Sequence, residues 1–241
     1  MRAIITYHSI DDSGSVISTD ARTFERHLDW LEREGVAVVP LEQLLALPHT
    51  ARAAALTFDD GIASVAEAAG PALGRRGWTG TVFIVSGHVG RDNQWPSLGR
   101  RQAPRLPMLT WDQVEALMAT GWTIGAHTRT HPDLPACRDE EIRGEILGSM
   151  EDLEEATGVR PRWFAYPYGA RDPRAETLVS RTFTGACTTT LAPLGQRPDP
   201  HALPRLDAYY LRGRLPAWGS AMMRSRFALR HGLRRIRAAI A

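Results

Sequence analysis

Residues 53–61 are Ala-Ala-Ala-Leu-Thr-Phe-Asp-Asp-Gly, a short apolar run that ends in two adjacent carboxylates and a glycine. The first six have the length and composition of a buried strand, with Asp59 and Asp60 at its carboxyl end. Adjacent side chains normally diverge here, but Gly61 permits a sharp turn that brings both carboxylates to one side. Two like charges this close need a cation beside them, so the segment predicts a metal site. The alternative is a turn in which one carboxylate caps the following helix.

Around this segment, short apolar runs alternate with helical patterns along the whole chain of 241 residues. Repeated strand-then-helix units without a second compositional block predict one parallel α/β domain. The expected strands are 3–6, 36–39, 53–58, 79–85, 122–126, 163–165 and 183–188. The expected helices are 23–33, 41–47, 65–75 with Pro71 inside it, 111–119 after Thr110 and with Gln113, and 139–157, which Gly158 ends.

Composition limits the class of protein. The chain has 29 basic residues, all arginine, and 27 acidic ones, so its net charge of +2 decides little, and we expect no nucleic-acid partner. Two cysteines, Cys137 and Cys187, are too few for a disulfide framework and indicate free thiols in a reducing compartment. No apolar stretch reaches the roughly 20 residues that cross a bilayer. Residues 1–8 resemble a buried strand rather than a leader, which predicts a cytoplasmic protein.

A second polar motif, His127-Thr-Arg-Thr-His131, follows the expected strand 122–126. Four-residue spacing places two imidazoles on one face of a turn, and Pro132 moves His131 out of the helical region, so a short loop that clamps a metal is expected. One Asp and two His make three ligands, which leave a fourth position open for water, as in catalytic zinc sites. The alternative is a pair of surface histidines.

Each candidate group directly follows an expected strand. His8 follows 3–6, the carboxylates follow 53–58, His127 follows 122–126, and Tyr168 follows 163–165. The carboxyl ends of parallel barrel strands meet at one rim, where the loops carry the chemistry. We therefore expect these side chains to lie together.

Three motifs in this order carry a resemblance to a known family: Thr-Phe-Asp-Asp-Gly (57–61), His-Thr-x-x-His (127–131) and Phe-Ala-Tyr-Pro-Tyr-Gly (164–169). Together they resemble the polysaccharide deacetylase family, also called carbohydrate esterase family 4 or the NodB-homology domain, across residues 1–210. The resemblance implies a distorted (β/α) barrel of about seven parallel strands. It also implies metal-dependent removal of the acetyl group from an N-acetylhexosamine in a polysaccharide, glycolipid or sugar-containing metabolite, with release of acetate.

The resemblance also implies a role for each matching position. Asp60, His127 and His131 would bind the metal, Asp59 would be the general base, and Tyr168 would offer its backbone N–H to the oxyanion. Zinc is the leading candidate for the metal because soft thiolates are absent from this ligand set, and cobalt, nickel and manganese also suit an Asp and two imidazoles.

The chain departs from the family pattern in its third motif. Many members carry there an arginine that tunes the base, and this chain has Ala165 in its place. Whether Arg162 or Arg205 substitutes is open from the sequence.

A second departure concerns the general acid. Most members carry it as a histidine near the C-terminus, where this chain offers only His231 inside a basic segment. The early Tyr-His-Ser at 7–9 resembles the permuted subgroup of the family, similar to the bacterial PgaB and IcaB deacetylases, and implies His8 as the acid. A buried structural histidine is the competing interpretation of His8. His27, His49, His88 and His201 are expected to be structural or surface residues.

Residues 211–241 carry eight arginines and no acidic residue, with large apolar residues interleaved. This pattern predicts a basic amphipathic helix appended to the domain 1–210. Such a helix either contacts a membrane peripherally, which would place the protein at the inner membrane face, or docks on the barrel as an ordinary terminal helix. The oligomeric state is not readable from the sequence.

Two features bear on substrate binding. The segment 87–107, rich in Arg, Pro and Gly, is long enough to form a lid. Five tryptophans are candidate sugar platforms, although large aromatic residues more often lie in cores: Trp78, Trp95, Trp111, Trp122 and Trp163.

Two other functions compete with N-deacetylation. The first is a metal-dependent amidohydrolase that acts on a small non-sugar amide or imide with the same centre. The second is a glycan-binding module with a relic site, which is disfavoured because the base, the ligands and the Tyr-Gly pair are all present.

Overall fold

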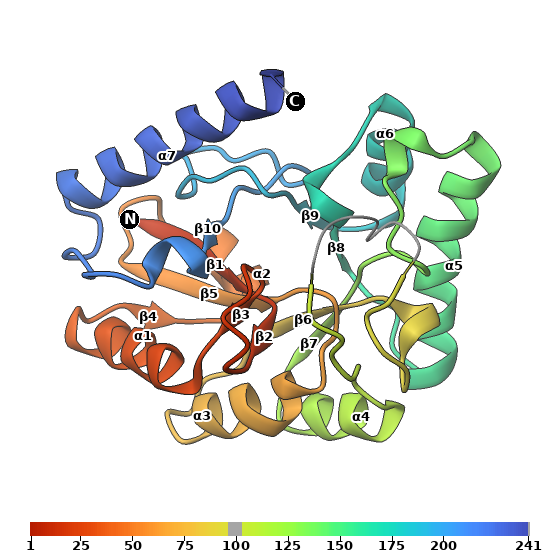
Figure 1. Ribbon diagram of the computed structural model, residues 1–241, viewed down its shortest axis with the longest axis horizontal. Helices are drawn as coiled ribbons and strands as arrows, with labels where there is room; N and C mark the ends of the chain where they lie inside the picture. Colours follow the sequence, from red (N-terminus) through yellow and green to blue (C-terminus); the bar gives the residue numbers. More distant parts are fainter. Residues whose placement is uncertain (96–102, 241) are drawn as a thin grey trace.

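The computed structural model describes residues 1–95 and 103–240 and has a curled parallel sheet at its centre (Figure 1). Seven strands follow one another in the order β10-β1-β5-β6-β7-β8-β9, and β4 pairs with the first residues of β5. The strands are β1 (Arg2–Tyr7), β4 (Ala37–Val38), β5 (Ala53–Phe58), β6 (Thr81–Ile84), β7 (Thr123–Ala126), β8 (Trp163–Ala165), β9 (Gly185–Cys187) and β10 (Leu206–Asp207). A separate short pair is formed by β2 (Ser9–Ile10) and β3 (Ser18–Thr19). The sheet forms an open half-barrel, which confirms the expected distorted (β/α) barrel.

Helices surround the sheet. They are α1 (Ala21–Arg33), α2 (Leu41–Ala46), α3 (Gly70–Gly74), α4 (Trp111–Ala119), α5 (Asp139–Thr157), α6 (Pro173–Thr182) and α7 (Ala221–Ile240). In Figure 1, α5 and α6 lie beside β8 and β9, whereas α7 lies at the opposite end of the sheet, beyond β10 and β1. None of the helices within the described ranges is long and apolar enough to cross a bilayer.

Local sequence signals explain several helix boundaries. Thr110 and Gln113 form the expected capping box of α4, and Gly158 ends α5 with a left-handed φ of 69°. The helix expected at 65–75 is instead a π-helical turn, Val65–Ala69, followed by α3. Pro71 falls in the first turn of α3, where its missing N–H leaves no helical hydrogen bond unmade.

The pairing of β1 with β5 brings two residues of the site together. All six residues of β1 and all six of β5 are buried, and they pair in register from Arg2 with Ala53 to Tyr7 with Phe58. The residue after each strand therefore emerges at the same height, so His8 and Asp59 are neighbours at the carboxyl edge of the sheet.

The C-terminal segment packs on the same core. A 3₁₀ turn, Ala208–Leu211, follows β10, and α7 begins only at Ala221 because the intervening stretch contains Pro216 and a left-handed Gly219. Met223 and Phe227 of α7 are fully buried in the main apolar cluster. One face of the basic helix is thus docked on the barrel.

A buried histidine joins α1 to this segment. His27 Nε2 lies 3.0 Å from the Leu211 carbonyl oxygen, and His27 Nδ1 lies 3.1 Å from Tyr7 Oη. A carbonyl only accepts, so Nε2 carries the proton and Nδ1 accepts from the tyrosine hydroxyl, which describes a neutral imidazole. Burial lowers the pKa of His27 from 6.5 to about 4.

We expect His27 to make stability depend on pH. Its folded-state pKa lies below the unfolded value, so the neutral ring contributes fully above pH 6.5, and this contribution falls as the pH drops toward 4. Between pH 6.5 and 4 the free energy of unfolding should fall by on the order of 3 kcal/mol. His27→Gln, whose amide can still donate to Leu211, should show a flatter free energy of unfolding across this window in urea titrations. His49→Gln, at an exposed position, is the control, and parallel curves for wild type and His27→Gln would refute the assignment.

Candidate active site

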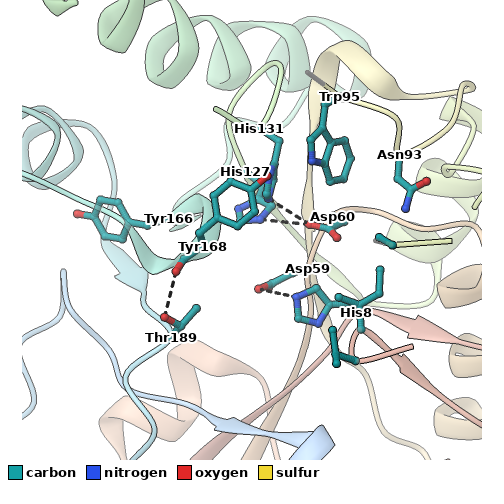
Figure 2. Close-up of a pocket in the computed structure, with 13 residues that line it drawn as sticks. His8, Asp59, Asp60, Asn93, Trp95, His127, His131, Tyr166, Tyr168 and Thr189 are labelled. Atoms are coloured by element: carbon teal, nitrogen blue, oxygen red, sulfur yellow. Dashed lines mark hydrogen bonds and ion pairs between the residues drawn. The ribbon is translucent and has the colours of Figure 1, made fainter. Parts of the chain in front are cut away.

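Loops after β1, β5, β7 and β8 meet at the carboxyl edge of the sheet around a cavity of about 390 Å³. Figure 2 shows that His8, Asp59, Asp60, His127 and His131 face one another across it. The expectation that these groups share one rim is confirmed.

Three buried side chains form a compact cluster. Asp60 Oδ1 lies 3.4 Å from Nε2 of both His127 and His131, and the candidate ligand atoms all lie within 4.8 Å of one another. His127 Nδ1 lies 2.7 Å from the Ala165 carbonyl oxygen, so it donates there, and the lone pair of Nε2 faces the cluster. One carboxylate oxygen and two imidazole nitrogens are the ligand types that zinc and similar cations take. The donor set therefore fits a divalent metal.

The protonation states of the cluster also suit a cation. Burial lowers the pKa of His131 to about 3, so this ring is neutral at neutral pH. Burial alone would raise the pKa of Asp60, but the close approach of His127 and of the other imidazoles outweighs burial and holds the pKa well below its usual value. Metal ligands must be deprotonated, and these two groups already are.

The second carboxylate is fixed by a buried arginine. Arg205, just before β10, places its two terminal nitrogens 2.6 Å from Oδ1 and Oδ2 of Asp59. Its Nε donates to the Thr188 carbonyl at 3.0 Å. Burial on its own would raise the pKa of Asp59, but the guanidinium charge and hydrogen bonds lower it overall. Asp59 is therefore ionised at neutral pH.

Of the two arginines that the sequence leaves open, only Arg205 reaches Asp59. Arg162 is exposed and pairs with Glu42 at 3.0 Å, away from the site, whereas Arg205 contacts Asp59 directly. Ala165 contributes its backbone carbonyl to His127 instead of a side chain. Sequence reasoning left Arg205 open because it lies 146 residues from Asp59, outside any motif.

His8 borders the cavity rather than the core. Its Nε2 lies 3.9 Å from Asp59 Oδ2, and a quarter of its side chain is accessible to solvent. Figure 2 shows the imidazole beside Asp59, with a dashed line that marks this contact. The competing interpretation of His8 as a buried structural residue does not describe this placement.

Strained backbone is concentrated in the three motifs. The non-glycine residues with left-handed φ, among those described, are Asp60 (72°), Thr128 (66°), His131 (57°) and Tyr168 (58°). Such conformations cost about 1 kcal/mol or more each and persist where the surroundings impose them, as at functional sites. Tyr168 lies in a 3₁₀ turn, Pro167–Gly169, and its ring packs edge-on at 4.5 Å against His131. The expected loop geometry of the His-x-x-x-His motif is confirmed.

Helix α5 holds the histidine loop in this conformation. Glu145 accepts hydrogen bonds from the backbone N–H groups of Arg129 and Thr130 at 2.8 and 2.9 Å, and from Thr130 Oγ1 at 2.6 Å. Asp152 accepts from Arg129 Nε at 2.8 Å and from Ser86 Oγ at 2.6 Å. These contacts tie the segment between the two histidines to a rigid helix.

We expect Glu145→Gln to weaken metal binding by about 10- to 100-fold, as is typical for supporting partners of metal ligands. The amide group cannot accept all the hydrogen bonds that the carboxylate accepts, so the loop loses part of its anchor. Calorimetric titration of the metal-free protein with Zn²⁺ measures the effect. Glu155→Gln, at an exposed position of the same helix, is the matched control, and equal affinities in the two variants would contradict the anchoring role.

Trp95 is the one candidate sugar platform that lines the cavity. Its ring stacks on His131 with centroids 4.4 Å apart and 28° between the planes. Trp78 and Trp122 border a different surface pocket, and Trp163 is buried in the core. The lid expected at 87–107 falls partly on residues 96–102, which lie outside the described residues.

Comparisons with known proteins identify the family of this chain. The sequence profile of the family described as polysaccharide deacetylase matches residues 46–183, more than half of the chain. YxkH of Bacillus subtilis is 26% identical over 76% of this chain, and chitin deacetylase 1 of Saccharomyces cerevisiae is 33% identical over 52% of it. The chain spans 61% and 35% of these two relatives.

Among solved structures, IcaB from Ammonifex degensii superposes with a TM-score of 0.74 at 25% identity, covering 86% of this chain and 93% of that one. The similarity thus extends across nearly the whole of IcaB. The chain belongs to the polysaccharide deacetylase family and is similar to its IcaB-like subgroup.

Proposed function

We propose that this protein is a metal-dependent N-deacetylase that releases acetate from an N-acetylhexosamine within a saccharide. The observation that carries the proposal is the single cavity in which Asp60, His127 and His131 converge with Asp59 beside them. Membership of the polysaccharide deacetylase family supports it.

Asp60, His127 and His131 would hold the cation, with zinc the leading candidate and cobalt, nickel or manganese also compatible with these ligands. When bound, a divalent cation supplies Lewis acidity that polarises an amide carbonyl and lowers the pKa of water toward about 7. His131 is neutral and Asp60 is ionised, so a cation would not have to displace a proton from either group.

The remaining groups divide the proton transfers. Asp59, ionised and oriented by Arg205, accepts a proton from the attacking water. The backbone N–H of Tyr168 donates to the carbonyl oxygen as it gains charge, where one such donor is typically worth about 2.7–4 kcal/mol. His8, beside Asp59 at the edge of the cavity, gives a proton to the departing amine.

Two measurements on one preparation test the proposal. Metal content is determined by elemental analysis, and acetate release is followed with N-acetylated oligosaccharides, nucleotide sugars and lipid-linked sugars. We expect bound metal together with acetate from at least one of these substrates. Bound metal without acetate from any N-acetyl sugar would favour hydrolysis of a small non-sugar amide, and neither metal nor acetate would favour a binding module.

His8→Ala is expected to slow amide hydrolysis by at least about 10²-fold while metal content stays unchanged, because the leaving amine loses its proton donor. A phenyl ester with a good leaving group needs no such proton, so p-nitrophenyl acetate should be hydrolysed with a much smaller loss. A comparison of the two substrates separates proton donation from general damage. Wild-type amide turnover in His8→Ala would remove the role.

A further inference from the structure

Charge is unevenly distributed along this chain. All 27 acidic residues precede residue 208, whereas eight of the 29 arginines follow it. Residues 1–207 therefore carry a formal charge of −6 and residues 208–241 one of +8. The positive charge is gathered on the segment that ends in α7, at one edge of the molecule (Figure 1).

Helix α7 has two apolar faces, one packed on the barrel and one exposed to solvent. Met223 and Phe227 are buried against the barrel, but Met222, Leu229 and Leu233 are 71%, 67% and 47% exposed. Spacings of seven and four residues place these three on one face of the helix. In the sequence the same spacing continues at 236 and 240, which are both isoleucine.

Three arginines of α7, Arg224, Arg226 and Arg230, have no carboxylate partner among the described residues. Arg224 donates to the Gly219 carbonyl, Arg226 donates to the Arg214 carbonyl at 2.8 Å, and Arg230 lies 4.9 Å above the ring of Tyr210. By contrast, arginines on the body of the protein, such as Arg76 and Arg174, are paired with carboxylates. Within the described part of the chain, the charges of these three arginines are therefore not neutralised by carboxylates.

We propose that α7 docks this protein on an anionic lipid bilayer, with Met222, Leu229 and Leu233 inserted at the headgroup boundary and the arginines on lipid phosphates. Exposed aliphatic side chains gain free energy only from an apolar environment, which a bilayer provides and a nucleic-acid backbone does not. A second copy of the same helix would bring two arginine-rich surfaces together and be repelled. Basic residues next to an anionic leaflet each add to the binding free energy.

A chain of contacts connects α7 to one wall of the candidate active site. Tyr210, under Arg230, contacts Tyr209 with ring centroids 5.2 Å apart, and Arg212 lies 4.6 Å above Tyr209. Arg212 also donates to the backbone carbonyl oxygens of Ser15 and Ser18. Between those two residues lies Val16, which is 65% exposed and lines the cavity. The proposal concerns where the protein binds and is independent of the reaction catalysed in the cavity.

Vesicle flotation tests the proposal with the full-length protein. Vesicles of phosphatidylcholine alone are compared with vesicles that also contain phosphatidylglycerol. We expect wild-type protein to float with the anionic vesicles and not with the neutral ones, and to be released by high salt. The triple variant Met222→Ser, Leu229→Ser, Leu233→Ser should bind at least about tenfold more weakly, because the inserted apolar area is lost.

Two further variants make the result decisive. Val159→Ser removes an exposed aliphatic residue of similar accessibility just after α5, at the other end of the sheet, and should bind like wild type. Leu229→Glu alone, at a strongly exposed position, should weaken binding without affecting the fold, which circular dichroism checks. Absence of wild-type binding to anionic vesicles would overturn the proposal. Equal binding by wild type and the triple variant would also overturn it, since a purely electrostatic surface would suit any polyanion.

Discussion

Asp59→Asn is expected to lower kcat by at least about 10²-fold while the metal stays bound. The amide cannot accept the proton of the attacking water, so the chemical step loses its base. Asp59 contributes no atom to the Asp60, His127 and His131 cluster, and it faces Arg205 instead. Turnover and metal content should therefore respond separately to this substitution.

Asp60→Asn is the matched comparison, because it changes the adjacent carboxylate by the same atom. It should lose metal, since Asp60 Oδ1 is the carboxylate oxygen nearest to both histidines. Elemental analysis and steady-state rates of both variants show which carboxylate binds the metal and which acts as the base. If Asp59→Asn loses metal in proportion to rate, Asp59 is a ligand and the assignment of base and ligand is wrong.

The elements that the sequence predicts best are those with strong local signals. Strands β5 and β8 and helices α4 and α5 have the expected bounds because apolar runs, a capping box and a terminal glycine mark them. Strand β10 has only two residues and no periodicity, so nothing local marks it. Helix α6 was missed although Asp172 and Pro173 form a recognisable start, because only Ala175 and Val179 along it are buried.

The same contrast holds for the candidate site. Each motif follows a parallel strand, and parallel strands share one carboxyl edge, so the convergence of the motif residues could be expected. Arg205 and Glu145 could not be found in this way. They reach the site from a loop before β10 and from the middle of α5, and only three-dimensional packing brings them to Asp59 and the histidine loop. Supporting residues of this kind have no fixed sequence distance from the groups that they support, so no sequence pattern marks them.

Arg205→Met is expected to destabilise the fold by about 3–5 kcal/mol, the usual cost of removing one partner of a buried ion pair. Methionine keeps much of the apolar volume. The loss in the free energy of unfolding therefore comes mainly from the Asp59 carboxylate, which stays buried without its counter-charge. Urea unfolding measures the change in free energy. Arg162→Met is the matched control, because its ion pair with Glu42 is exposed and should be worth no more than about 1 kcal/mol.

The pH dependence of this loss identifies its cause. In the wild type the pKa of Asp59 lies below the ordinary 3.8, so ionised Asp59 stabilises the fold above that pH and the contribution is lost as the pH falls. Without the guanidinium, burial dominates and raises the pKa of Asp59. Ionised Asp59 then destabilises the fold, and its protonation relieves this cost. The loss of stability in Arg205→Met should therefore become smaller as the pH falls.

The double variant Asp59→Asn, Arg205→Met completes the cycle. With no buried charge left on either side, it should be more stable at neutral pH than Arg205→Met alone. If the double variant is instead less stable by the sum of the two single losses, the two residues act independently, and the ion pair is not what holds Asp59 in place.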